Sequence, residues 1–230
     1  MSSAPMPSLE VELAGEPVLL LADRALCWPR EATLFLADPH FGKGTAFRRS
    51  GIAVPDDTGE ELERLTGLIT SHQARRLVVL GDLLHARAGA TERLHADLAR
   101  WRAAHPSLEV ILIRGNHDLR AGDPRPTFVD RVVSGPATIG PFDCCHEPRQ
   151  TPGRHVLAGH LHPGFALSGR TGHSLRSPCF WLRPGLAVLP AFGAFTGLSM
   201  VDVEPGDRII LADVGQVREI NPMRQPLRRG

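Results

Sequence analysis

The sequence predicts an α/β protein with mixed β-sheets. Apolar strand-like runs alternate with two segments of helical period as far as residue 113, and the rest of the chain reads as short strands and turns. Polar residues follow several of these runs, at the position where open α/β sheets place their ligand sites. The 230 residues, 42% hydrophobic and 22% charged, suit a globular protein with a substantial core.

Five apolar runs in the first half are predicted to be strands, because each is rich in leucine, valine or isoleucine and is bounded by turn residues. They cover residues 9–14, 17–22, 32–38, 76–82 and 108–113. Continuous apolar runs of this length are typical of strands that are buried on both faces.

Two helices are predicted between these strands. The first runs from about Asp57 to His72, where Asp57 and Glu60 stand in capping-box spacing ahead of leucines with helical period. The second lies around residues 90–104 and ends before Pro106.

No domain boundary is visible, so residues 1–220 are predicted to form a single domain, and residues 221–230 a disordered basic tail. The N-terminus shows no secretory signal and no apolar stretch could span a membrane, which gives a cytoplasmic location as the expectation. The four cysteines lack metal-type spacing and are read as buried, with Cys144 and Cys145 on opposite faces of a strand. A net charge of +1 means that any nucleic-acid partner must be held by a local patch.

Polar residues with metal-binding or acid–base chemistry recur at the ends of five apolar runs. Any one of them is also a common turn former or packing residue, but repetition at five strand ends predicts a single site. These candidates are Asp38, His40, Asp82, Asn116, His117, Asp118, His146, His160 and His162.

The spacing of these residues favours a site for two metal ions. Asp38 and His40, like His160 and His162, are two positions apart, so on an extended backbone each pair projects to one side. Two carboxylates, four imidazoles and an amide oxygen are too many ligands for one ion with open positions, and they suit two ions bridged by Asp82. Nitrogen and oxygen donors favour Mn²⁺ or Fe, with Zn²⁺ as an alternative.

The motifs "DPH", "GD", "GNHD", "H" and "GHLH", in this order across residues 33–163, resemble those of the calcineurin-like binuclear metallophosphoesterases. The resemblance implies a four-layer αββα fold, in which two mixed β-sheets pack as a sandwich flanked by helices. It also implies that His117 stands beside the scissile phosphate and that Asp118 orients or tunes it. The implied ligands are Asp38, His40 and His162 for one metal, Asn116, His146 and His160 for the other, and Asp82 between them.

Four further segments, residues 40–55, 146–148, 159–164 and 179–197, resemble the bacterial ligase-associated DNA damage response endonucleases. This resemblance implies Mn²⁺ as the metal, DNA as the substrate, and a functional association with a DNA ligase and helicase repair cluster. Pro39 stands where an aliphatic residue is expected, but its fixed φ is compatible with an extended "DPH".

The sequence therefore predicts a phosphodiesterase, with a Mn²⁺-dependent single-strand DNA endonuclease as the leading hypothesis. Two divalent ions about 3.5–4 Å apart lower the pKa of a shared water and stabilise an in-line displacement at phosphorus. His117 would protonate the leaving alkoxide. Two alternatives stay open: a hydrolase of a nucleotide or other small phosphoester, and a scaffold without catalysis.

Other residues near the motifs carry weaker predictions. Lys43 and Arg48, in the predicted loop after "DPH", are candidates for binding substrate phosphates, with a solvated surface as the alternative. His85 is predicted to cap a helix rather than face the site. Several aromatic residues could stack bases, but in a chain without tyrosine they are predicted to lie in the core: Phe47, Phe165, Trp181, Phe192 and Phe195.

Overall fold

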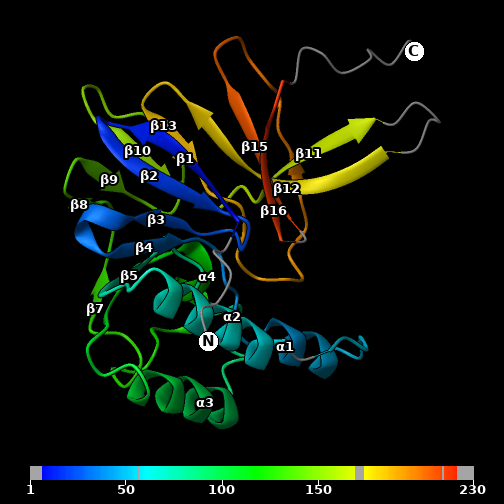
Figure 1. Cartoon of the computed structure of the whole chain (residues 1–230). Coiled ribbons are helices and arrows are strands. Elements are labelled where there is room, and N and C mark those ends of the chain that lie inside the picture. The colour runs from blue at the N-terminus through cyan, green and yellow to red at the C-terminus, as the bar shows by residue number, and fades with distance from the viewer. Residues whose placement is uncertain (1–6, 56, 169–173, 214, 222–230) are drawn as a thin grey trace.

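The structure is a computed structural model that describes residues 7–55, 57–168, 174–213 and 215–221. Two mixed sheets pack together and helices cover the outer face of the first, which confirms the predicted α/β class with two packed sheets (Figure 1). Nearly all of the predicted basic tail, residues 222–230, lies outside the described residues. None of the described helices combines the length and hydrophobicity that crossing a bilayer requires.

The first sheet has seven strands that follow one another in chain order. Neighbours are antiparallel as far as the fourth strand and parallel from there on, so the sheet is mixed. The strands are β1 (Ser8–Leu13), β2 (Glu16–Leu21), β3 (Leu26–Trp28), β4 (Thr33–Leu36), β5 (Arg76–Val79), β6 (Glu109–Ile113) and β7 (Arg131–Val133).

The second sheet contains the C-terminal strands, and β9, β10 and β13 form its parallel centre. Most of the other pairs are antiparallel. The strands are β8 (Ala137–Ile139), β9 (Phe142–Cys144), β10 (His155–Ala158), β11 (Pro163–Ser168), β12 (Ser174–Arg183), β13 (Leu186–Val188), β14 (Ser199–Met200), β15 (Arg208–Asp213) and β16 (Gln216–Ile220).

Helices α2 (Thr58–Ser71) and α3 (Glu92–Ala103) lie where the sequence predicts them. The expected capping box is absent: within the described residues the side chain of Asp57 makes no capping hydrogen bond, whereas Thr91 caps α3 by accepting from the Leu94 amide at 3.2 Å. The sequence did not predict the short helices α1 (Lys43–Arg49), α4 (Asn116–Ala121) and η1 (Pro29–Glu31), nor β3. Segments this short carry no readable period.

Alternate residues of the first sheet face two separate cores. Leu34 and Leu36 of β4 pack in the cluster that includes α2 and α3, whereas Phe35 packs between the sheets against Phe142. All three are almost completely buried, so polar side chains have room only beyond the strand ends. This burial is why the candidate site residues collect there.

All four cysteines are free and buried, as predicted. Cys144 lies in the cluster between the sheets, and Cys145 belongs to a smaller cluster with Val156 and Val188. The two thiols therefore pack into different cores, in agreement with the expectation of opposite faces.

Candidate metal centre

The seven proposed metal ligands come together at the ends of five strands, β4, β5 and β6 of the first sheet and β9 and β10 of the second. Their donor atoms form two groups in which all atoms lie within 4.8 Å of one another. The first group is Asp38, His40 and His162, and the second is Asp82, His146 and His160. Asn116 joins the second group, since its Oδ1 lies 2.9 Å from His146 Nε2.

The paired ligands converge through left-handed turns and not, as the spacing suggested, through an extended backbone. Asp38 and His40 have φ of 52° and 51°, and His160 and His162 have φ of 71° and 47°. Asp82 is also left-handed, with φ of 53°. This conformation costs roughly 1–3 kcal/mol for each non-glycine residue and is concentrated at functional sites. The expectation of an extended "DPH" was therefore wrong, although its two donors still meet.

Two motif glycines leave the space that these ligands occupy. A Cβ on Gly81, which has φ of 84°, would lie 2.1 Å from His146 Nδ1. A Cβ on Gly115 would lie 2.2 Å from Asp82 Oδ1. The glycines of "GD" and "GNHD" are thus explained by the close approach of a ligand side chain.

The donor set fits divalent cations, because atoms that carry lone pairs point at one another. His146 Nδ1 donates to the Leu80 carbonyl at 3.0 Å, so Nε2 of the neutral ring carries a lone pair. That Nε2 lies 2.9 Å from Asn116 Oδ1 and 3.0 Å from His160 Nδ1. Asp38 Oδ1 is buried without a hydrogen-bond partner among the described residues. A metal ion would supply the partner that these convergent acceptors lack.

Asp82 lies between the two groups. Its Oδ1 is 3.4 Å from His146 Nε2, and its Oδ2 is 3.9 Å from His40 Nε2. The His117 amide donates to Oδ1 at 2.8 Å and fixes the carboxylate in this orientation. One oxygen therefore faces each ligand group, which is the placement that a bridging carboxylate needs.

The buried histidine of the first group is held in the neutral form that binds metals. Burial is the main cause that lowers the pKa of His40 to about 2, and the neighbouring His162, Lys43, His117 and His85 contribute to the same shift. Burial also raises the pKa of Asp82, with nearby Asp38 acting in the same direction. A cation between these groups would offset the cost of keeping the carboxylate ionised.

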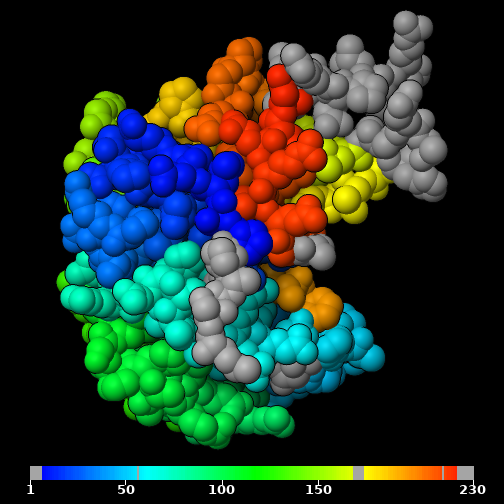
Figure 2. Space-filling model, in the orientation of Figure 1, coloured from blue at the N-terminus to red at the C-terminus, as the bar shows by residue number. Residues whose placement is uncertain are grey.

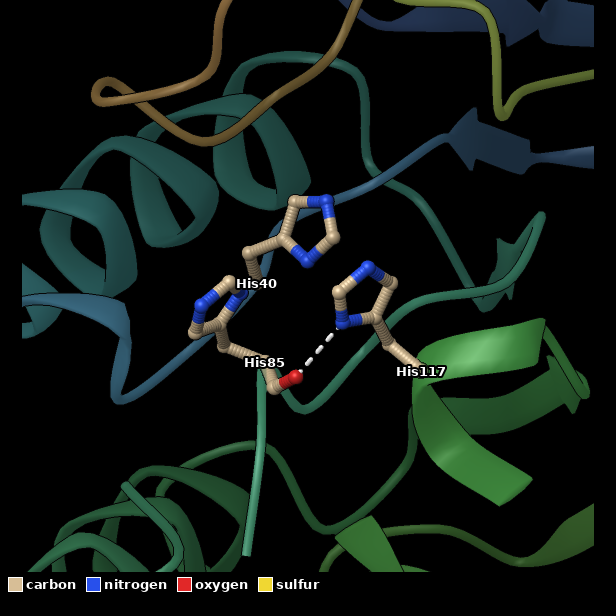
Figure 3. A group of neighbouring side chains, drawn as sticks. All are labelled: His40, His85 and His117. Carbon is tan, nitrogen blue, oxygen red and sulfur yellow. Dashed lines mark hydrogen bonds between the residues drawn. The ribbon is translucent and has the colours of Figure 1, made fainter. Parts of the chain in front are cut away.

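His117 and His85 form a pair next to His40 (Figure 3). The Nδ1 of His117 donates to the His85 carbonyl at 2.7 Å, and the two rings stack with centroids 5.2 Å apart. Both rings pack against His40, and the donor nitrogens of all three lie within 4.8 Å. The prediction that His85 would cap a helix was wrong, because its ring faces the site.

Asp118 supports His117 through the backbone. Its carboxylate is completely buried and accepts from the Leu84 amide at 3.1 Å and from the Gly115 amide at 2.9 Å. Burial raises its pKa to about 6. Asp118 was expected to orient the His117 ring directly, but the His85 carbonyl does so instead. Asp118 links the two backbone segments that carry these histidines, because its carboxylate accepts from an amide in each.

Lys43 and Arg48 lie on α1 and not in a loop, and the surroundings of the two side chains differ. Lys43 lines a narrow recess together with His40, while burial lowers its pKa and nearby Glu61 acts against that shift. The exposed Arg48 donates to the Val54 carbonyl at 3.0 Å and also to the Thr45 hydroxyl. Of the two, Lys43 is the one placed beside the proposed metal ligands.

Comparison with known proteins agrees with this fold. No family model and no curated protein matches the sequence. The solved structure of Pseudomonas putida nuclease MPE does match, with 39% sequence identity, a TM-score of 0.81, and coverage of 93% of this chain and all of that one. An Escherichia coli phosphoesterase, YfcE, aligns with 16% identity, a TM-score of 0.40 and coverage of 79% and 87% of the two chains, too weak a likeness to add to the argument.

The chain belongs to the metallophosphoesterases, enzymes with a binuclear, metal-dependent phosphoesterase centre. Within them it falls in the subfamily of the Pseudomonas putida nuclease. This confirms the family resemblance that the motifs indicated.

Proposed function

We propose that this metallophosphoesterase is a Mn²⁺-dependent nuclease that hydrolyses phosphodiester bonds in single-stranded DNA. The observation that carries the proposal is the arrangement around His117, a histidine outside both ligand groups whose ring is fixed beside them. Support also comes from the similar protein of Pseudomonas putida, which is described as a nuclease. Nitrogen and oxygen donors without a thiolate suit Mn²⁺.

In this proposal the two ligand groups hold one divalent ion each. Asp38, His40 and His162 would hold the first ion, and Asp82 would be a ligand of both. When bound, two such ions activate a water for attack and stabilise the charge that develops at phosphorus. The second ion takes the remaining ligands, Asn116, His146 and His160.

His117 is assigned the proton transfer to the leaving oxygen. Its Nδ1–H donates to the His85 carbonyl, so Nε2 is the nitrogen left to face the substrate. In the imidazolium form Nε2 carries the proton that passes to the nucleotide alkoxide as the P–O bond breaks. The Nδ1 hydrogen bond persists in both protonation states and keeps the ring in place. His117, 31% exposed, can be reached by a strand from solvent.

Lys43 is assigned to a phosphate of the substrate, since it lines the recess that also contains His40. Arg48 has a weaker place in this scheme because its guanidinium already bonds to Val54 and Thr45. A role in repair beside a DNA ligase and a helicase stays a prediction from the family resemblance.

The test is to strip the enzyme of metal, reload it with Mn²⁺, Fe²⁺ or Zn²⁺ separately, and assay three substrates: single-stranded DNA, duplex DNA and a small aryl phosphodiester. We expect Mn²⁺ to restore the highest activity and single-stranded DNA to be cleaved in preference to duplex. An enzyme that hydrolyses the aryl diester but neither DNA would instead support the small-phosphoester alternative. Failure of every metal on every substrate would contradict the phosphodiesterase proposal.

A further inference from the structure

The loop between β13 and β14 holds an aromatic side chain at the surface beside the metal centre. Phe195 is 43% exposed, whereas Phe192, three residues earlier, is completely buried. The sequence predicted a core position for both. That prediction is confirmed for Phe192 and wrong for Phe195.

One side of this loop is fixed to the segment that carries the first metal ligand. The Phe192 amide donates to the Ala37 carbonyl at 2.8 Å, and the Gly193 amide donates to the Asp38 carbonyl at 3.2 Å. The backbones approach so closely that a Cβ on Gly193 would lie 2.5 Å from the Pro39 carbonyl oxygen. The loop and the metal-binding turn therefore form one unit.

The other side of the loop is fixed to helix α2. The buried Glu61 carboxylate accepts from the Ala194 amide at 3.0 Å, directly before Phe195. The Arg64 guanidinium lies 4.0 Å from the Phe192 ring centroid and donates to the carbonyl of that residue. In the space-filling view, orange atoms of this part of the chain lie against the cyan and blue atoms of α2 and α1 (Figure 2). The backbone that leads into Phe195 is thus held in place before any ligand arrives.

Phe195, Pro39, His40 and Lys43 line the same recess. Its cavity volume is about 20 Å³, enough for a single water molecule. A nucleobase cannot enter so small a space, so a nucleotide bound here must lie across the rim. The rim offers an aromatic ring from Phe195 and an ammonium group from Lys43, next to a proposed metal ligand.

We propose that Phe195 is a stacking platform for a base of the bound strand, next to the phosphate that is cleaved. This inference rests on the proposed nuclease function and adds a substrate-binding residue to it. Stacking accepts every base, because each has an apolar π-face, and it needs no net positive charge. It therefore suits a single-strand substrate and a chain of formal charge +1.

The experiment compares Phe195→Ala and Phe195→Trp with the wild-type enzyme, all loaded with Mn²⁺. The substrates are a short oligothymidylate and an oligomer of the same length whose sugars are all abasic. Loss of a stacked base weakens binding by roughly 5- to 150-fold, so Phe195→Ala should raise KM for oligothymidylate by a factor in this range, with a much smaller change in kcat. On the abasic oligomer KM should stay close to that of the wild type, and Phe195→Trp should retain tight binding.

Leu175→Ala is the matched control, because Leu175 is an exposed apolar side chain (65%) on β12 that does not line the recess. An equal rise in KM on both oligomers would overturn the inference, since it would show a role without a base. Unchanged KM for Phe195→Ala on oligothymidylate would overturn it as well. If the wild-type enzyme cleaves neither oligomer, it is the nuclease proposal that fails.

Discussion

Replacing Gly115 by alanine is a direct test of where Asp82 stands. The backbone at Gly115 has φ of −96° and ψ of 177°, which any residue adopts, so the substitution acts by its methyl group alone. That methyl carbon would lie 2.2 Å from Asp82 Oδ1 and 2.5 Å from the Asp82 backbone nitrogen, where ordinary contact begins at 3.4 Å. The backbone and the carboxylate of Asp82 must both shift, the carboxylate oxygen by about 1.2 Å, and the residue, which is 2% exposed, has little room to do so.

A displacement of this size acts on both ions if Asp82 bridges them. Misplacing a catalytic group by about 1 Å can cost roughly 100-fold in rate, so kcat for single-stranded DNA should fall by about that factor. Overpacking a buried site should also lower the free energy of unfolding by about 1–3 kcal/mol. Asp82→Ala, which removes the bridge altogether, should abolish activity more completely than the loss of any other single ligand.

The assay measures bound Mn²⁺ per chain, kcat and the unfolding free energy on the same preparations. Gly59→Ala on α2 is the matched control, because its methyl group would meet no described atom within 4 Å. This variant should keep wild-type kcat and metal content. A Gly115→Ala enzyme with two ions and undiminished kcat would refute the placement of Asp82 between the ligand groups.

Three further predictions concern proton transfer, metal binding and the recess. His117→Ala should lose far more activity on DNA than on an activated aryl diester, because only the nucleotide alkoxide needs a proton on leaving. Equal losses on both substrates, with metal content intact, would indicate that His117 binds phosphate or positions an ion. Adding Mn²⁺ to metal-free enzyme at about 100 times its Kd should raise Tm by roughly 5–10 °C in thermal unfolding, since the cation binds only the folded ligand set; an unchanged Tm would argue against a built site. Lys43→Ala should raise KM for single-stranded DNA, and the slope of log affinity against log salt concentration should become shallower by about 0.7. Arg48→Ala should change both quantities less, because its side chain already bonds to Val54 and Thr45. Equal effects of the two substitutions would indicate that both side chains contact the strand.

Most of the proposed centre could be predicted because of the way the sheets are buried. Strands β4, β5 and β6 are covered on both faces, so polar residues such as Asp38, Asp82 and Asn116 follow the apolar runs directly. Parallel neighbours then bring these ends together at one edge of the sheet. The hydrophobic pattern thus predicts that Asp38, Asp82 and Asn116 meet at one end of the sheet, whereas the order of the strands could not be read from it.

Local backbone geometry was less accessible to prediction. The side-chain alternation argument assumed an extended chain at Asp38 and His40, whereas tertiary contacts hold both in left-handed turns. His85 follows Asp82 by three residues in an irregular loop, and in such a loop the spacing does not tell which way a side chain points. Phe195 did offer a signal, since it lies between Gly193 and Gly197 in a segment without strand alternation, where an aromatic has little core to enter.

Charge at the centre explains how a nearly neutral chain can act on a polyanion. The seven proposed ligands include only two carboxylates, Asp38 and Asp82, and burial holds the His40 imidazole neutral. Two divalent ions would therefore leave the occupied centre with a net positive charge, in a setting where Lys43 adds to it. Attraction for phosphate then depends on the bound metals more than on the protein surface. A basic patch is unnecessary on this view, and the remaining affinity for a strand falls to contacts of the kind that Phe195 offers at the rim.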